Sequence, residues 1–418
     1  MSAPSRDMKP PTVGTATRLV VLTSLYIAQG LPFGFFSQCI PILMRQSGAS
    51  LLAVAASNLL ALPWAFKLVW APGFNRPRLV RPEARRLSVL ALQLAATGLL
   101  LLGIPLDPRT EAIPVFVLVV LSNLVSATQD IPTDAMTVES LAPSARGLGN
   151  GAQVAGYRIG MIIGGGWMLT ILDQDGWSTA LGLLAFALIL TAVPLLVAGP
   201  LMPHGEPEAP LRHPAGKAPL FFTGKGMAAW FGVLVIYKLG TSFGTGSIRP
   251  MLVDWGYTLS EIGWMLGTIG SGAAICGSIA GGWLTTRIPR ALPTFALLQA
   301  AALLVWVAAS RDPSGPGARD LVFFAILAEH FTSGMATTAL FTTMMARCRP
   351  GLAASDYTTQ ASTVLIADGL VVIASGASAQ GLGYPGHLAL ASFVAFIAVA
   401  ATLRISAGPG TQTASGPG

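Results

Sequence analysis

Apolar runs of about 20 residues recur along the whole chain, and they constrain its fold more than any other feature. A run of that length crosses a hydrocarbon core of about 30 Å as an α-helix. The composition agrees, because 53% of the 418 residues are hydrophobic and only 10% are charged, whereas soluble domains carry about a quarter charged residues. The runs lack the alternation of apolar and polar residues that membrane barrels need. The sequence therefore predicts an all-α membrane protein.

Charged residues and Pro/Gly breaks divide the apolar runs into twelve expected transmembrane helices, and the longest polar interval separates six from six. We expect a tail over 1–17, a six-helix bundle over 18–200, a cytoplasmic linker over 201–225, a second bundle over 226–406 and a tail over 407–418. The first run is too long for a secretory signal and is expected to be retained. The expected spans are 18–44, 52–74, 87–105, 113–138, 147–172, 178–199, 226–250, 259–284, 291–309, 320–346, 356–380 and 387–405.

The basic residues indicate an orientation. Most of the 25 Lys and Arg residues fall in the segments that lie inside if both termini are cytoplasmic. Orientation explains these short basic loops better than nucleic-acid binding does. The halves are also similar, since "GLPFGFFS" from Gly30 lines up with "GTSFGTGS" from Gly240. Two six-helix bundles related by a pseudo-twofold axis resemble the major facilitator fold, which by itself names no substrate.

Seven ionisable residues fall inside the expected spans. Each costs at least about 2.5 kcal/mol if it faces lipid at a helix centre, so each is expected to face the bundle interior or a wet pathway. The three bases are Lys67, Arg158 and Lys238, and the four acids are Asp130, Asp134, Glu329 and Asp368.

The first-half charges predict a gate or a substrate-binding group. Asp130 and Asp134 are four residues apart, share a helix face around Pro132, and can form neutral pairs with Lys67 and Arg158. The proline is expected to bend the helix toward the pathway. The alternative is that these ion pairs only hold helices together.

In the second half two acids accompany one base, Lys238. A buried carboxylate without a full partner can take up a proton near neutral pH. We therefore expect Glu329 or Asp368 to couple transport to protons.

Two further patterns have competing interpretations. Gly156, Gly160 and Gly164 align small residues on one helix face, which favours close helix packing over a sliding surface. Several aromatic residues could stack on a sugar or aromatic ligand, although packing and interface anchoring are commoner roles. These are Phe33, Phe35, Phe36, Trp64, Trp70, Tyr157 and Trp264.

Other chemistry is not indicated. The pattern G-x-x-x-x-G-K-[ST] of ATP-driven proteins is missing, and three cysteines and four histidines form no metal-ligand or catalytic spacing. We expect no cofactor and no metal. An intramembrane enzyme remains the rival class, which flux measured against product formation would separate from a transporter.

Three long segments carry a resemblance to a known family. "ALPWAFKLVWAP" from Ala61, "SATQDIPTDA" from Ser126 and "ARGLGNGAQVAGYRIGMIIGGG" from Ala145 resemble the AmpG-like muropeptide permeases, a major facilitator branch that includes acetyl-CoA transporters and RhtX/FptX-type siderophore permeases. The resemblance covers the first half well and the second half mainly in layout.

The resemblance implies a proton-driven importer of the bacterial inner membrane that works on a periplasmic small molecule, in a lipid bilayer and as a monomer. The family's polar residues correspond to Lys67, Gln129, Asp130, Asp134, Tyr157 and Arg158. Two departures matter, because Asn75 stands where the family has an acid and the chain lacks room for two additional spans. They favour a siderophore as the substrate, ahead of a muropeptide, with acetyl-CoA, another solute or efflux as further alternatives.

Overall fold

The computed structural model describes residues 14–46, 62–201, 221–223 and 226–406, and every regular element within them is helical. The expected tails and most of the expected linker lie outside these residues, as do residues 52–61 of the expected second span. Nine helical segments in the described part are long and apolar enough to cross a membrane. Two of these, at 143–198 and 353–404, are more than fifty residues long. Each turns sharply at a glycine with positive φ, Gly176 at 84° and Gly383 at 66°, and so accounts for two crossings.

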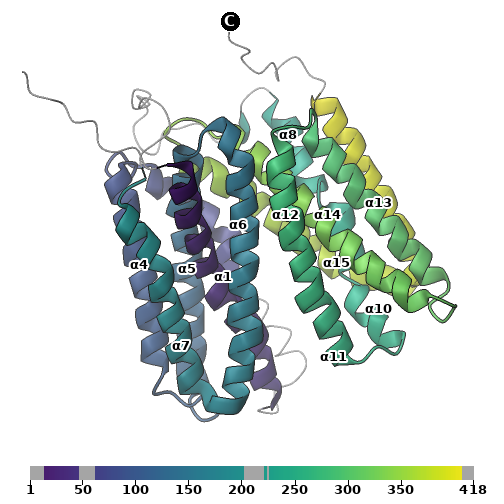
Figure 1. Ribbon diagram of the computed structural model, residues 1–418, viewed down its shortest axis with the longest axis horizontal. Helices are drawn as coiled ribbons and strands as arrows, with labels where there is room; N and C mark the ends of the chain where they lie inside the picture. Colours follow the sequence, from purple (N-terminus) through teal and green to yellow (C-terminus); the bar gives the residue numbers. More distant parts are fainter. Residues whose placement is uncertain (1–13, 47–61, 202–220, 224–225, 407–418) are drawn as a thin grey trace, which may run out of the picture.

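The helices form two groups that lie side by side (Figure 1). The N-terminal group consists of α1 (Thr15–Gln46), α3 (Leu62–Phe66), η2 (Lys67–Val69), η3 (Ala71–Asn75), α4 (Pro82–Gly103), α5 (Ala112–Ser140), α6 (Arg146–Met161), the π-helical η5 (Ile162–Trp167) and α7 (Met168–Ala198). The C-terminal group consists of α8 (Met227–Ile236), α9 (Leu239–Thr245), α10 (Ile248–Asp254), α11 (Leu259–Ile262), the π-helical η7 (Gly263–Gly270), α12 (Ser271–Thr285), α13 (Ala291–Arg311), α14 (Ala318–Ala346) and α15 (Ala353–Ser406).

Two expected spans are interrupted where a single helix was predicted. The described part of the second span consists of α3, η2 and η3, because Pro72 cannot donate the backbone hydrogen bond that would continue a helix. The seventh span is divided into α8, α9 and α10, with breaks at Lys238 and Ser247. Its "GTSFGTGS" segment is rich in glycine, which lowers the preference for a continuous helix.

Helix α1 begins and α15 ends on the same side of the molecule, at the top of Figure 1, which we call the terminal side. The two groups are joined mainly there. Helix α6 packs against α12 and α14, while α15 packs against α5, α3, η2 and η3. The hydrogen bonds between the groups come from the same region, including Asn75 to Ser355 at 2.5 Å and Asn150 to Thr342 at 3.2 Å. The groups are thus in contact on the terminal side and diverge toward the opposite side.

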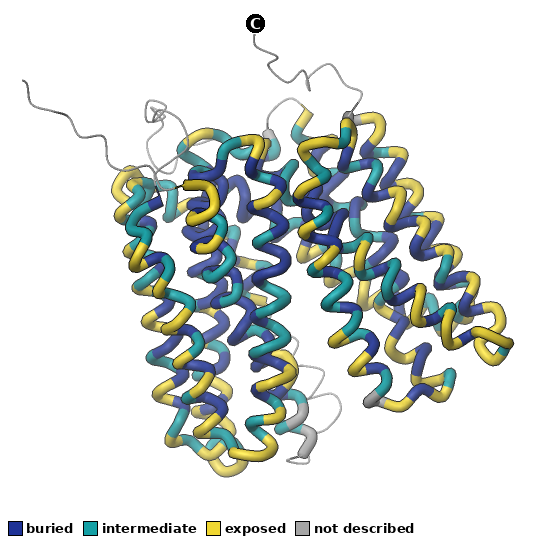
Figure 2. Tube along the Cα trace, in the orientation of Figure 1, coloured by how far each residue is buried: buried dark blue, intermediate teal, exposed yellow. Residues whose placement is uncertain are grey.

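Burial follows what a membrane protein needs. Buried residues lie along the helix faces that meet inside each group, whereas exposed residues cover the outward faces and the loops (Figure 2). The exposed side chains include many large apolar ones, such as Leu94, Ile113, Val197 and Ile373. Apolar exposure on this scale would be unfavourable in water and is expected where lipid is the solvent.

Glycines set the closest approach inside the N-terminal group. A Cβ on Gly156 or Gly160 of α6, or on Gly164 of η5, would lie within 2.8 Å of a backbone oxygen of α1. Gly30 of α1 faces α6 in the same way, with its Cβ position 2.2 Å from the Tyr157 carbonyl oxygen. Only glycine allows two helix backbones to come this close.

Candidate functional site

A buried charge cluster lies where the N-terminal group faces α15. Lys67, whose side chain is 4% exposed, forms an ion pair with Asp130, and its Nζ lies 3.8 Å from Asp134 Oδ2. Both acids come from the same face of α5, with Pro132 between them. Lys67 reaches them because the short η2 turn interrupts the second span at this depth. One ammonium group therefore serves two carboxylates.

Arg158 does not complete a second pair with these acids, which corrects the expectation from the sequence. Among the described residues Lys67 alone forms ion pairs with Asp130 and Asp134. Arg158 instead interacts electrostatically with Glu329 on α14 of the other group. Arg158 lies five residues after Gln153, the α6 residue that donates to Asp134. Five residues correspond to a net rotation of about 140° around a helix axis. Arg158 therefore points away from α5.

A polar network connects Asp134 to the C-terminal group. Its Oδ1 accepts hydrogen bonds from the Tyr26 hydroxyl at 2.9 Å and from the Gln153 amide at 3.3 Å. The side-chain oxygen Oε1 of Gln153 in turn accepts a hydrogen bond from the Tyr357 hydroxyl of α15 at 3.2 Å. Tyr26, Gln153 and Tyr357 were not predicted from the sequence, because none of them carries a charge within a span. Uncharged polar side chains within apolar runs were the signal that could have revealed them.

Gln129 lies apart from this cluster. Its amide donates to Gln93 on α4 at 3.2 Å, and Gln93 donates to the Leu188 carbonyl and to Thr191 on α7. The side chain thus joins three helices inside the N-terminal group. Its position differs from that of Asp130, the next residue, because adjacent positions of a helix point about 100° apart.

The charges of the C-terminal group form two smaller sites. Lys238, at the break between α8 and α9, has its Nζ 4.0 Å from Asp368 Oδ2, and Ser242 donates to Asp368 at 3.0 Å. Glu329 Oε2 lies 2.7 Å from Nδ1 of the adjacent His330 and faces Arg158 across the group boundary. Asp368 therefore has a charged basic partner in Lys238, whereas Glu329 contacts His330 and is attracted electrostatically by Arg158. In the N-terminal group, by contrast, two carboxylates share one ammonium group, which the sequence did not predict. Proton coupling by Glu329 or Asp368 stays a prediction.

Three of the seven aromatic candidates come together. The rings of Phe33, Trp64 and Tyr157 have pairwise centroid distances of 5.9, 5.9 and 6.4 Å, and Lys67 Nζ lies 5.6 Å from the Trp64 ring. Phe35 and Phe36 instead pack inside the N-terminal group, and Trp264 is 58% exposed.

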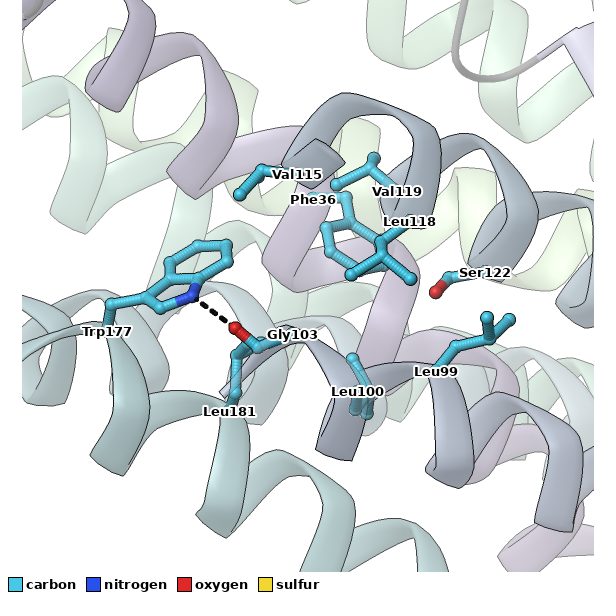
Figure 3. A pocket seen from close by; sticks show the side chains of 10 residues that line it. All are labelled: Phe36, Leu99, Leu100, Gly103, Val115, Leu118, Val119, Ser122, Trp177 and Leu181. Carbon is cyan, nitrogen blue, oxygen red and sulfur yellow. Dashed lines mark hydrogen bonds between the residues drawn. The ribbon is translucent and has the colours of Figure 1, made fainter. Parts of the chain in front are cut away.

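A small cavity between α1, α4, α5 and α7 is a poor candidate for a binding site (Figure 3). Its lining is apolar except for Ser122, and the Trp177 indole N–H already donates to the Gly103 carbonyl at 2.9 Å. The volume of about 10 Å³ corresponds to a single water molecule. Within the described residues, no cluster of His, Cys, Asp and Glu could hold a metal ion.

Comparison with known proteins identifies the family to which the chain belongs. The profile of the Major Facilitator Superfamily matches residues 22–367. The anhydromuropeptide permease of Escherichia coli (strain K12) is 31% identical over 355 residues, which are 81% of this chain and 70% of that protein. A putative transporter AmpG 4 of Rickettsia conorii is 21% identical over 383 residues, which are 88% of this chain and 92% of that one.

Two solved structures share the fold. FucP, a major facilitator transporter in the outward conformation, matches with a TM-score of 0.67 at 13% identity over 93% of this chain and 97% of that one. A bacterial homologue of the iron transporter ferroportin in an outward-facing state also matches with a TM-score of 0.67, at 11% identity over 95% and 100%. Identities this low show the fold alone. With the profile match and the permease relatives, they establish that the chain is a multi-pass membrane protein of the major facilitator superfamily, in its AmpG-like muropeptide permease branch.

Proposed function

We propose that this protein imports a muropeptide, an anhydro-sugar linked to a short peptide, across the bacterial inner membrane by alternating access. The observation that carries the proposal is the gathering of ionisable side chains where the two helix groups face each other. Lys67, Asp130 and Asp134 lie on one side, and Arg158 faces Glu329 across the boundary. Such groups are unfavourable in lipid and are typical of substrate and ion pathways.

The relatives support the proposed substrate class. The expectation of a siderophore finds no support among them, whereas the Escherichia coli relative at 31% identity is an anhydromuropeptide permease. A peptide carries both carboxylate and ammonium groups. The mixed charges of Arg158, Glu329 and Lys238 can accept such a zwitterionic chain better than a polyanion.

The proposed orientation places the terminal side in the cytoplasm, because the loops on that side carry most of the basic residues. Because the helix groups contact each other on that side and diverge on the other (Figure 1), the proposal has the pathway closed toward the cytoplasm and open toward the periplasm. A periplasmic substrate would enter from the open side, and the hydrogen bonds on the terminal side would break before its release.

Protons are the proposed driving ion, because one carboxylate in the N-terminal cluster lacks a base of its own. The site is neutral only when one of the two acids carries a proton. Proton uptake from the periplasm and release to the cytoplasm would then accompany each transport cycle.

The test is uptake of labelled anhydro-muropeptide and of labelled siderophore in cells that lack their own permeases, with and without an uncoupler. We expect muropeptide uptake that the uncoupler abolishes. Siderophore uptake in place of muropeptide uptake would refute the substrate, and uptake that resists the uncoupler would refute proton coupling. Product formed without net flux would favour an intramembrane enzyme.

A further inference from the structure

Phe33 of α1, Trp64 of α3 and Tyr157 of α6 form what we call the aromatic cluster. Three helices each contribute one ring, and each ring lies within 6.4 Å of the other two. Trp64 is 8% exposed, whereas Phe33 and Tyr157 are partly exposed although they lie in membrane-spanning helices. The two partly exposed rings leave aromatic surface that the protein itself does not cover.

The aromatic cluster lies next to the polar network, on its open side. Phe33 follows Tyr26 by seven residues, or about two turns of the same α1 face, and Tyr157 follows Gln153 by four residues of α6. Both spacings lead away from the terminal side, because α1 and α6 begin there. Trp64 adjoins the charge cluster through Lys67 and the C-terminal group through its carbonyl oxygen, which accepts a hydrogen bond from Ser362 of α15. A solute that enters from the open side would reach these rings before it met the closed network.

Two buried N–H donors near the rings lack an acceptor. The Trp64 indole nitrogen has no hydrogen-bond partner among the described residues, and neither has the amide nitrogen of Gln29, which is 2% exposed. Gln29 lies between Tyr26 and Phe33 on the same α1 stripe, three residues after one and four before the other. An unpaired buried donor costs about 1–3 kcal/mol, which a ligand oxygen would recover.

The chemistry of the ligand group follows from these features. Lys67, whose Nζ lies 5.6 Å from the Trp64 ring, is already paired with two carboxylates and is therefore not free to bind an anion. It offers ring faces, which suit the C–H face of a pyranose, together with donors that suit carbonyl and hydroxyl oxygens. A nucleotide base would also stack, but its phosphates would need unpaired cations.

We propose that the aromatic cluster binds the N-acetylated sugar ring of the substrate, with the N–H groups of Trp64 and Gln29 donating to its acetamido or hydroxyl oxygens. The inference rests on the proposed import of muropeptides and assigns the sugar part to these residues. The peptide part would extend toward Arg158, Glu329 and Lys238.

The test is binding of a labelled disaccharide of N-acetylglucosamine and anhydro-N-acetylmuramic acid, without peptide, to the purified full-length protein in lipid nanodiscs. Trp64→Phe keeps a ring and removes the N–H group, and Gln29→Leu removes the amide. We expect each to weaken disaccharide binding about five- to tenfold, as the loss of one hydrogen bond predicts. Trp70→Phe is the matched control, because the Trp70 indole also has no acceptor among the described residues but lies outside the aromatic cluster.

The outcomes separate the two proposals. If the wild type imports muropeptide but binds no disaccharide, or if Trp64→Phe and Gln29→Leu both bind as tightly as wild type, the sugar assignment is overturned while import stands. If the wild type neither imports muropeptide nor binds the disaccharide, the proposed function fails. Thermal unfolding of each variant identifies one that does not fold, and the other variant then decides the result.

Discussion

Asp134 and Asp130 differ in their surroundings although both approach Lys67. Asp130 is in direct contact with the ammonium group, which stabilises its charged form. Asp134 has two neutral donors, Tyr26 and Gln153, on its Oδ1 atom, while Oδ2 lies 3.8 Å from Lys67. Oδ2 can therefore hold a proton without disturbing either hydrogen bond. This division of roles makes Asp134 the better proton carrier of the two.

We predict that Asp134→Asn abolishes proton-driven accumulation, because an amide keeps the Oδ1 hydrogen bonds but cannot titrate. Substrate exchange without a gradient should persist. The measurement is the ratio of internal to external substrate in proteoliposomes under an imposed pH gradient, and this ratio should fall to about one. Glu329→Gln and Asp368→Asn are measured in parallel. Asp320→Asn, an exposed acid at the start of α14, is the matched control. Normal accumulation in Asp134→Asn would return the role to Glu329 or Asp368.

At this scale the sequence predicted part of the site. The proximity of Lys67 to Asp130 and Asp134 follows from depth and four-residue spacing, which are visible in one chain. The partner of Arg158 could not be predicted in this way, because the contacts of Arg158 depend on the rotation of α6 and on the distance between the two helix groups. Tyr26 and Gln153 carry no charge. Their polarity within apolar runs makes them candidates, but only the three-dimensional structure shows that both contact Asp134.

Among the elements, α6 and α12 form the closest contact between the groups. The Cβ position of Gly147 lies 2.3 Å from the Gly282 carbonyl oxygen, and that of Gly151 lies 2.8 Å from the Ser278 carbonyl oxygen. Further from the terminal side both helices continue into π-helical segments, η5 and η7. The glycines thus belong to the part of the boundary that must separate when the terminal side opens.

We predict that Gly147→Ala favours the state that is open on the terminal side. The added methyl group would overpack the closed contact by roughly 1–3 kcal/mol, which shifts the ratio of states at least about fivefold. Alkylation of Cys348, which lies in the loop between α14 and α15, should accelerate in a Cys39→Ser, Cys276→Ser background. Gly98→Ala is the control, because in the described part of the chain no heavy atom lies within 4 Å of its Cβ position. Equal alkylation rates in both variants would contradict the prediction.

The start of α11 has a pH-dependent cap. The Thr258 backbone N–H and hydroxyl group donate to the Glu261 carboxylate, and these bonds hold the pKa of Glu261 below its ordinary value. The Thr258 hydroxyl oxygen in turn accepts a hydrogen bond from the Glu261 backbone N–H, as in a capping box. Because the pKa is lowered by folding, the stabilisation is full above the unfolded pKa and is lost as pH falls through the folded one.

We predict that the first turn of α11 frays as pH falls below the ordinary glutamate pKa of 4.5. Hydrogen-exchange protection of residues 259–262, corrected for intrinsic rates, should decrease over that range. Glu261→Gln keeps the geometry but cannot titrate, so its protection should not change with pH. Constant protection in the wild-type protein would show that the cap does not depend on the charge.

The helix breaks show what sequence patterns can predict about elements. The turns at Gly176 and Gly383 fall in the short intervals expected between spans, because a polar or glycine-rich gap is local information. The division of the seventh span was not predicted. Its glycine-rich "GTSFGTGS" segment lowers the preference for a continuous helix, but the positions of the breaks depend on the packing of α9 against α15.

For the whole molecule, apolar length and basic loops were sufficient to predict a membrane protein with two helical groups. They could not predict the conformational state, because both states of a transporter bury similar surfaces with the same sequence. The state is defined by side chains from different groups that meet on the terminal side. Asn150 to Thr342, Asn75 to Ser355 and Gln153 to Tyr357 are such contacts.

We predict that locking these contacts stops transport. Asn150 and Thr342, replaced by cysteines in a background without the three native cysteines, should be joined by a short bis-methanethiosulfonate reagent, because their side chains are 3.2 Å apart. Each thiolate displaces a sulfinate from the reagent and forms a disulfide that a reductant can cleave. Uptake should fall in proportion to the crosslinked fraction, since the terminal side can no longer open.

Cleavage of the crosslink by a reductant should restore uptake. Each single-cysteine variant, treated with the same reagent, should retain uptake. Disaccharide binding from the open side should persist in the locked protein, because the aromatic cluster lies beyond the contact. Full turnover by the crosslinked protein would mean that the two groups do not separate here, and that the substrate leaves by a route other than the boundary between α6 and α14.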